Sequence, residues 1–268
     1  MKSIFKLVVF LVCLAAIAYL GYSYLQKNEE QPQGNANIKV SEPKSNQEVT
    51  FPFKVTGEAR VFENVLNVRL KDSKGTVLFE DFETANSPDM GIFGPFEENI
   101  NYLLKEPESQ DVILEVYWLS PKDGSEIDMV TIPLKLVLGD TTKLKVFFNN
   151  SNLDPEVSCN KVFPVERIVP KTQAPARLAL EMLLSGPKYR DLADGYFSSI
   201  NMDVRIQQLV VEERIARADF DDQLEFQVGG SCRVSAIRAQ ITETLKQFPT
   251  VDSVVISING RTEDILQP

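Results

Sequence analysis

Two cysteines in the second half of the chain, Cys159 and Cys232, are the residues best suited to chemistry. A redox-active pair is usually a close Cys-x-x-Cys, and these two lie far apart in the sequence. In an exported protein, two such cysteines favour a structural disulfide. We therefore expect Cys159 and Cys232 to be bonded. Two unpaired, buried thiols are the alternative.

Histidine is absent from the chain. Its absence removes the commonest general base, the usual zinc ligand and every triad that needs an imidazole. Chemistry based on carboxylates, lysine or a metal held by carboxylates remains formally open. We expect the protein not to be an enzyme, and we predict no catalytic, cofactor-binding or metal-binding residue.

Two short segments of the second half resemble ligand sites in part. Residues 229–231 (Gly-Gly-Ser) precede an expected helix and could cradle an anion, although a plain turn with Ser231 as the helix cap is favoured. Asp219, Asp221 and Asp222 could suggest calcium, but they lack the glycine and distal glutamate of a calcium loop. We interpret the three aspartates as a solvated strand end.

The formal net charge is −10, with 43% hydrophobic and 25% charged residues. This composition is typical of a globular protein. The acidic balance argues against nucleic acid or anionic lipid as a main partner, because both need clustered lysine and arginine.

The N-terminus indicates the compartment. Residues 7–25 carry no charge, and Lys2 and Lys6 precede them. Nineteen residues in a helix just span a bilayer core, and the preceding lysines stay in the cytoplasm. We predict that residues 1–25 form a signal anchor, a single transmembrane helix with the rest of the chain extracytoplasmic.

Two other fates of this segment remain open. Cleavage after residues 16–18 (Ala-Ile-Ala), near Ala18, would secrete the protein. Lipidation at Cys13 is the other, although the preceding residues 10–12 (Phe-Leu-Val) put a bulky residue where a lipobox has a small one. Residues 26–37 are polar and lack periodicity, and we expect a flexible linker there.

Residues 38–140 show short alternating or apolar runs separated by polar turns. In one run, Leu66, Val68 and Leu70 point to one face and Asn67 and Arg69 to the other. About seven such strands predict an all-β, antiparallel sandwich of the immunoglobulin class. The expected strands are residues 38–41, 51–59, 65–72, 76–82, 96–104, 111–119 and 128–138. Trp118, the chain's single tryptophan, is interpreted as a core or rim residue.

This part of the chain resembles the immunoglobulin-like domain of bacterial spore germination proteins. The resemblance rests on residues 38–78 and 91–102, and the phrase PFKVTGEARVFE at 52–63 is its most specific portion. It implies a sandwich of the kind found in cell-surface and envelope proteins, with no known catalytic residues.

Residues 141–260 combine strand-like alternation with the helical periodicity of apolar residues. Strands are expected at 143–150 and 163–170, a helix from Thr172 to Ser185, and a hairpin from 204–212 and 214–220. A second helix follows Ser231 and stops at Pro249, before a last strand at 251–260 and a C-terminal tail at 261–268. We predict an α+β domain with two helices packed on one small mixed sheet.

The second domain is similar to the GerMN domain of sporulation and spore germination proteins. The matching stretches are 145–170, 179–187 and 229–260, with LLSGP and TLKQFPTVDSVVISING as the specific phrases. The hairpin turn at Glu212, Glu213 and Arg214 lacks the Asn or Gly often found there. The resemblance implies an envelope module similar in fold to ring-building modules, without an established active site.

From these observations we expect a non-catalytic, membrane-tethered binding or scaffolding protein of the bacterial cell envelope. Its partners would be envelope proteins or further copies of itself, joined through the GerMN-like domain. The alternative is an accessory of cell-wall processing that binds peptidoglycan or another glycan. An aromatic groove with paired acids would favour the alternative, and a smooth sheet edge would favour the scaffold.

Overall fold

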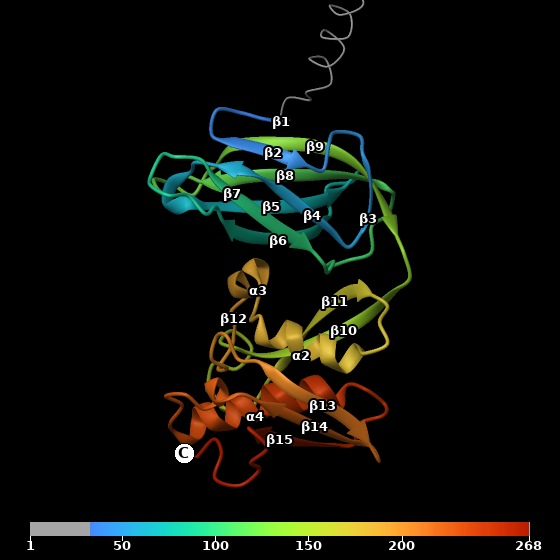
Figure 1. Cartoon of the computed structure of the whole chain (residues 1–268), viewed down its shortest axis with the longest axis vertical. Helices are drawn as coiled ribbons and strands as arrows, with labels where there is room; N and C mark the ends of the chain where they lie inside the picture. The colour runs from blue at the N-terminus through green and yellow to red at the C-terminus, as the bar shows by residue number, and fades with distance from the viewer. Residues whose placement is uncertain (1–32, 268) are drawn as a thin grey trace, which may run out of the picture. The chain divides into compact units, whose positions relative to one another are not determined.

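The computed structural model describes residues 33–267, and its first domain consists of two sheets facing each other. One sheet has the order β3-β9-β8-β5-β6 and the other β1-β2-β4-β7 (Figure 1). This arrangement is consistent with the expected immunoglobulin-like sandwich. The strands are β1 (Gln33–Gly34), β2 (Ile38–Glu42), β3 (Glu48–Phe51), β4 (Phe53–Ala59), β5 (Val65–Asp72), β6 (Val77–Thr84), β7 (Gly94–Ile100), β8 (Asp111–Leu119) and β9 (Glu126–Leu138).

The strand expected at 51–59 is two strands that belong to different sheets. Pro52 separates β3 from β4, because proline has no N–H for a continuous ladder. β3 pairs with β9 in parallel, with Val49 opposite Leu136. β4 pairs with β2 and β7 in antiparallel register. The expectation of a purely antiparallel sandwich is therefore wrong at this edge.

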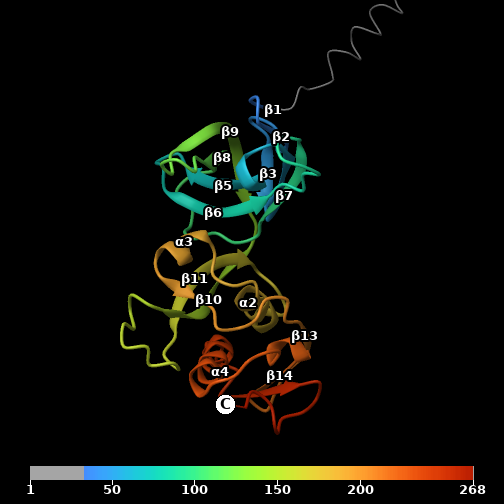
Figure 2. The same ribbon diagram turned by 90° about the vertical axis from the view of Figure 1, so that its left-hand side faces the viewer.

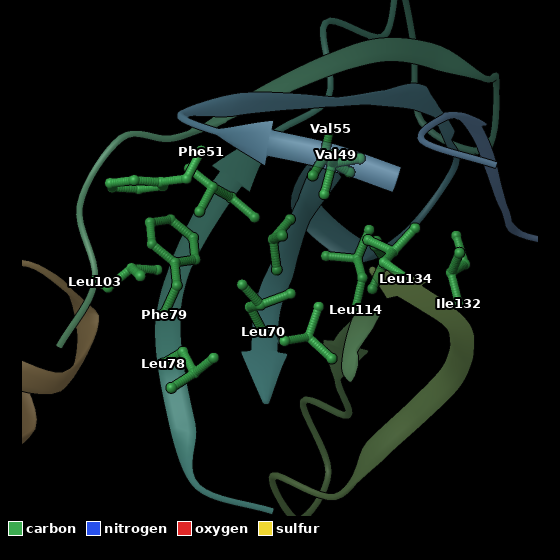
Figure 3. Packing of buried hydrophobic residues seen from close by; sticks show 14 of the residues in the cluster. Val49, Phe51, Val55, Leu70, Leu78, Phe79, Leu103, Leu114, Ile132 and Leu134 are labelled. Atoms are coloured by element: carbon green, nitrogen blue, oxygen red, sulfur yellow. The ribbon is translucent and has the colours of Figure 1, made fainter. Parts of the chain in front are cut away.

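The sandwich core forms between the inner faces of the two sheets. Leu66, Val68 and Leu70 of β5 are completely buried, as their alternation predicts. Figure 3 shows Leu70 with Leu78 and Phe79 of β6 and Leu114 of β8, alongside residues of β3 and β4. Full burial of each such side chain contributes roughly 1.5–3 kcal/mol.

The outer face of β5 is polar, as predicted, but Asn67 and Arg69 at its centre are largely shielded from solvent. Arg69 lies opposite Glu80 of β6 and Glu115 of β8 in the strand register. Its guanidinium forms ion pairs with Glu115 at 2.6 Å and with Glu126 at 2.7 Å. These hydrogen-bonded carboxylates raise the pKa of Arg69 further above its usual value. A charged layer therefore covers this part of the sheet.

The second domain contains two three-stranded sheets and three α-helices. Its elements are β10 (Thr141–Asn150), β11 (Phe163–Pro170), α2 (Pro175–Leu184), α3 (Tyr189–Ala193), β12 (Tyr196–Phe197), β13 (Ile206–Glu212), β14 (Ile215–Phe220), α4 (Ser231–Lys246) and β15 (Ser253–Ile258). One sheet runs β11-β10-β12 and is antiparallel, and the other runs β13-β14-β15 and is mixed.

The prediction of one small mixed sheet is thus wrong. Helix α4 contacts β10 of the first sheet and α2 (Figure 2), and it also contacts β15 of the second sheet. The helix buries Val234, Ile237, Ile241 and Leu245 within the core of this domain. A helix with apolar residues along this much of its surface can serve two sheets at once.

Helix α2 starts three residues later than expected. Thr172 is not its cap, because the Thr172 hydroxyl accepts a hydrogen bond from the amide of Ala174, which precedes the helix. Pro175 occupies the first turn, where the missing N–H is not needed.

Both flanks of the expected domains take part in the fold. The expected linker 26–37 is structured at its end, where the side-chain amides of Asn35 and Asn37 donate to Asp128. The C-terminal tail is anchored too, because Ile265 and Leu266 are buried in the second domain's core.

The segment predicted to cross the membrane lies outside the described residues. No helix within residues 33–267 has the length and apolar character needed to span a bilayer.

The two domains meet through continuous packing. Gly139 and Asp140 separate β9 from β10, where the change of hydrophobic period predicts a domain boundary. The sandwich core nevertheless includes Leu144 and Val169 of the second domain. A β-bridge also joins Leu103 to Ile168.

Candidate functional site

A disulfide pins a long loop of the second domain to the start of helix α4. Cys159 belongs to the loop between β10 and β11, and Cys232 lies in the first turn of α4. The two sulfur atoms are bonded, with 4.9 Å between the Cα atoms. The helix begins after Gly230, which has a positive φ of 85° and provides no side-chain cap. The expected capping role of Ser231 is therefore wrong.

Buried amides organise the chain around this disulfide. Asn149 at the end of β10 donates to the carbonyls of Cys159 and Lys161, at 3.2 and 3.0 Å. Its own side-chain oxygen accepts hydrogen bonds from Gln240 of α4 and from Ser199, both at 3.1 Å. Because every group of this network has a partner, it fixes the loop, the strand and the helix relative to one another.

A hollow of about 520 Å³ opens beside the disulfide. It lies between the end of β10, the loop that carries Cys159, strand β12 and the first turns of α4. Its lining is mainly apolar and includes Val157, Phe197 and the disulfide, with Asn150, Asp154 and Arg233 as polar members. Exposed Val157 and Phe197 give this hollow an apolar rim.

Arg233 brings a positive charge to the hollow. Its guanidinium donates to the carbonyl of Ser199 at 3.2 Å and to the side-chain oxygen of Asn201 at 2.5 Å. It also donates to the carbonyl of Gln227 at 3.4 Å. These acceptors are neutral, so no described carboxylate compensates the charge. The guanidinium is held in place and stays available to a partner.

Asp154 brings the matching negative charge. Its carboxylate accepts hydrogen bonds from the amide and the hydroxyl of Ser158, at 2.7 and 2.8 Å. These bonds hold the pKa of Asp154 below its usual value, so it is ionised at neutral pH. One fixed anion, one fixed cation and an apolar rim suit recognition of a partner. The lining offers no nucleophile next to a base.

The three aspartates near the end of β14 do not converge. Asp219 accepts hydrogen bonds from the Ser257 hydroxyl and the Gly260 amide, and Asp221 accepts one from the Arg205 amide. These bonds stabilise turns at the end of the second sheet, and Asp222 follows Asp221 in the chain. Across residues 33–267, no group of three or more such side chains is placed to hold a metal ion.

The second sheet of this domain also ends in an open strand. β13 pairs with β14 on one side, and no described strand flanks its other side. The pairing has an irregularity at Gln207 and is regular from Gln208 to Glu212. Glu213 and Arg214 both have positive φ in the hairpin turn, which makes it type I′ without Asn or Gly.

Sequence reasoning predicted the two cysteines of this site but missed Asn149, Gln240 and Arg233. The asparagine pair at the end of β10 was the available signal, since amides at a strand end often hold a following loop. Gln240 sits among apolar helix positions and is completely buried, which only its tertiary partners explain.

Comparison with known families agrees with both resemblances. Residues 37–125 match the family model described as the immunoglobulin-like domain of bacterial spore germination. Residues 145–264 match the model described as sporulation and spore germination. The predicted resemblance is thereby confirmed. A search of curated proteins finds no match.

Solved structures similar to this chain include GerMN domains. The first GerMN domain of the sporulation protein GerM from Bacillus subtilis shares 21% identity, covers 45% of this chain and 85% of its own, and has a TM-score of 0.35. The tandem GerMN domains of the same protein share 21% identity, cover 46% and 41%, and give 0.34. A putative lipoprotein from Clostridium perfringens shares 14% identity, covers 47% and 80%, and gives 0.32.

Proposed function

Because the chain carries an immunoglobulin-like domain of the spore germination type and a sporulation and spore germination domain, we propose that it is a non-catalytic scaffolding protein of the bacterial cell envelope. Residues 1–25 tether it to the membrane with both domains outside. Uncharged residues 7–25 behind Lys2 and Lys6 support the tether.

The open edge of β13 carries the proposal. Residues 208–212 form a regular strand with one unpaired side, and this stretch contains neither proline nor lysine. Such an edge presents backbone N–H and C=O groups to another strand. Monomeric proteins usually protect an edge of this kind, and strand addition is a common mode of association. We propose that copies of this chain associate through β13.

Substitution on the two edges of the same sheet tests this assignment. Val210 of β13, Arg217 of β14 and Val255 of β15 lie side by side in register on one face. A lysine at an edge opposes strand addition, so Val210→Lys should abolish association of the full chain in detergent. Val255→Lys is the matched control on the opposite edge and should leave association intact. Sedimentation equilibrium over a range of concentrations measures the mass.

Crosslinking and proteolysis of the full chain in cells test its association and its outward orientation. A photo-crosslinker at Gln208 should give an adduct of twice the chain's mass in spheroplasts, and protease added outside should digest that adduct. Monomeric wild-type protein, or loss of association only in Val255→Lys, would contradict the assignment to β13. Protection of the domains from protease would contradict the outward orientation.

A further inference from the structure

A second hollow, of about 460 Å³, lies on the outer face of the first domain's larger sheet. It forms where β5 and β6 meet the short turn Phe62–Asn64, the segment after β8, and Tyr189 of α3. No residue of this hollow belongs to the disulfide site, which lies in the second domain.

The walls of this hollow are aromatic and exposed. Phe62 is 49% exposed and Phe82 is 47% exposed. Phe82 lies directly opposite Asn67 in the pairing of β5 with β6, which places its ring beside the carboxamide. Large aromatic side chains gathered around a concave surface indicate a ligand that covers them.

Three polar side chains reach the hollow without a partner. Asn67 is only 3% exposed and still lines the hollow, so it forms the floor. Its carboxamide, the hydroxyl of Tyr189 and the carboxylate of Glu63 make no hydrogen bond or ion pair with any residue of 33–267. Within residues 33–267 the fully buried side-chain atoms without a partner are Asp72 Oδ2 and the Tyr102 hydroxyl, so the Asn67 carboxamide must reach the open space of the hollow, where its N–H and carbonyl can meet a ligand.

We propose that this hollow binds an uncharged sugar ring, and specifically an N-acetylated amino sugar of a polysaccharide. The C–H face of a pyranose packs on aromatic rings, here those of Phe62 and Phe82. The acetamido group matches the Asn67 carboxamide, because each offers one N–H and one carbonyl to the other. Ring hydroxyls can donate to Glu63 and bond to the Tyr189 hydroxyl.

The charge and number of the polar groups distinguish this ligand from others. Glu63 and the chain's net charge of −10 disfavour an anionic ligand. An apolar peptide side chain would cover the rings but leave most of the three polar groups without a hydrogen-bond partner. A sugar ring carries hydroxyl groups around its whole edge and can satisfy all three.

Binding of N,N′,N″-triacetylchitotriose to the full chain in detergent tests the proposal. Calorimetry should detect binding to the wild type, and cellotriose, which lacks acetamido groups, should bind at least tenfold more weakly. Asn67→Leu keeps the side-chain size and removes the amide, and Phe62→Ala removes one wall. Each should weaken triacetylchitotriose binding about tenfold or more, as expected for one buried contact.

Matched controls separate this site from unfolding and from the edge strand. Phe226→Ala removes another exposed phenylalanine, 58% exposed and outside the hollow, and should bind normally. Val210→Lys should also bind triacetylchitotriose normally. If the chain does not self-associate through β13, the sugar-binding proposal is therefore unaffected. Thermal melting confirms that each variant is folded. The proposal would be overturned if the wild type bound no sugar or bound both sugars with equal affinity. It would also be overturned if the hollow preferred a proline-rich peptide and that peptide lost affinity in the same variants.

Discussion

Removing Arg167 alone should destabilise the protein more than removing Arg167 and Asp191 together. The two side chains form an ion pair with 4% and 5% of their residues' surface exposed. The Asp191 carboxylate also accepts a hydrogen bond from the amide of Lys188 at 2.8 Å. The Arg167 guanidinium lies 4.9 Å from the centre of the Tyr102 ring, at the contact between the domains.

The expected magnitudes follow from this burial. Arg167→Met leaves the Asp191 carboxylate buried without its cation, and loss of one partner of such a pair costs about 3–5 kcal/mol. Asp191→Leu should cost a similar amount. The double variant removes both charges and fills the space with apolar atoms, so it should lie within about 1 kcal/mol of the wild type. The coupling energy is then on the order of several kcal/mol.

Urea denaturation of the full chain in detergent, followed by far-ultraviolet circular dichroism, measures the four free energies of unfolding. Arg214 and Asp252 form an ion pair with side chains that are 59% and 63% exposed, and they serve as the matched control. Its double-mutant cycle should give less than about 1 kcal/mol. Additive losses at Arg167 and Asp191 would refute the reasoning, because they would mean that neither charge depends on the other.

Two further predictions concern the disulfide and the pH dependence of stability. Replacing Cys159 and Cys232 by alanine opens a loop with a sequence separation of 73 and should cost about 4 kcal/mol, seen as a lower melting temperature; full thiol labelling of denatured, unreduced wild type would contradict the bridge. Burial, then the charges of Asp81 and Glu83, raise the pKa of Glu98 to about 8 against the opposing Lys188. Above about pH 4.5 the folded state therefore holds a proton on Glu98 that the unfolded state has lost. As a result, the contribution of Glu98 to the free energy of unfolding should fall by on the order of 1–2 kcal/mol from pH 6 to pH 8. Glu98→Gln should flatten that slope, and an unchanged slope would contradict it.

Local pattern determined most of the secondary structure and the general character of each domain. Period-2 alternation in β5 predicted that Leu66, Val68 and Leu70 face the core, and they are completely buried. The change to a helical period after Gly139 predicted the two long helices, α2 and α4. These patterns are readable because each reflects a face buried by its own element, whatever the partner is.

Where two distant segments had to meet, the sequence could not decide the result. The expected strand at 51–59 runs through Pro52, and only the packed sandwich shows that the chain changes sheets there. Likewise, the apolar stripe of α4 did not indicate that the helix contacts two sheets.

The candidate sites divide in the same way. Cys159 and Cys232 were predictable because an exported context and residue type suffice to suggest a bond. Asn67 and Arg69 were assigned correctly to the outer face, yet their environments depend on the neighbouring strands and, for Asn67, on the surrounding loop and Tyr189. Side-chain direction follows from local backbone geometry, whereas burial and hydrogen-bond partners depend on segments that meet only in the folded chain.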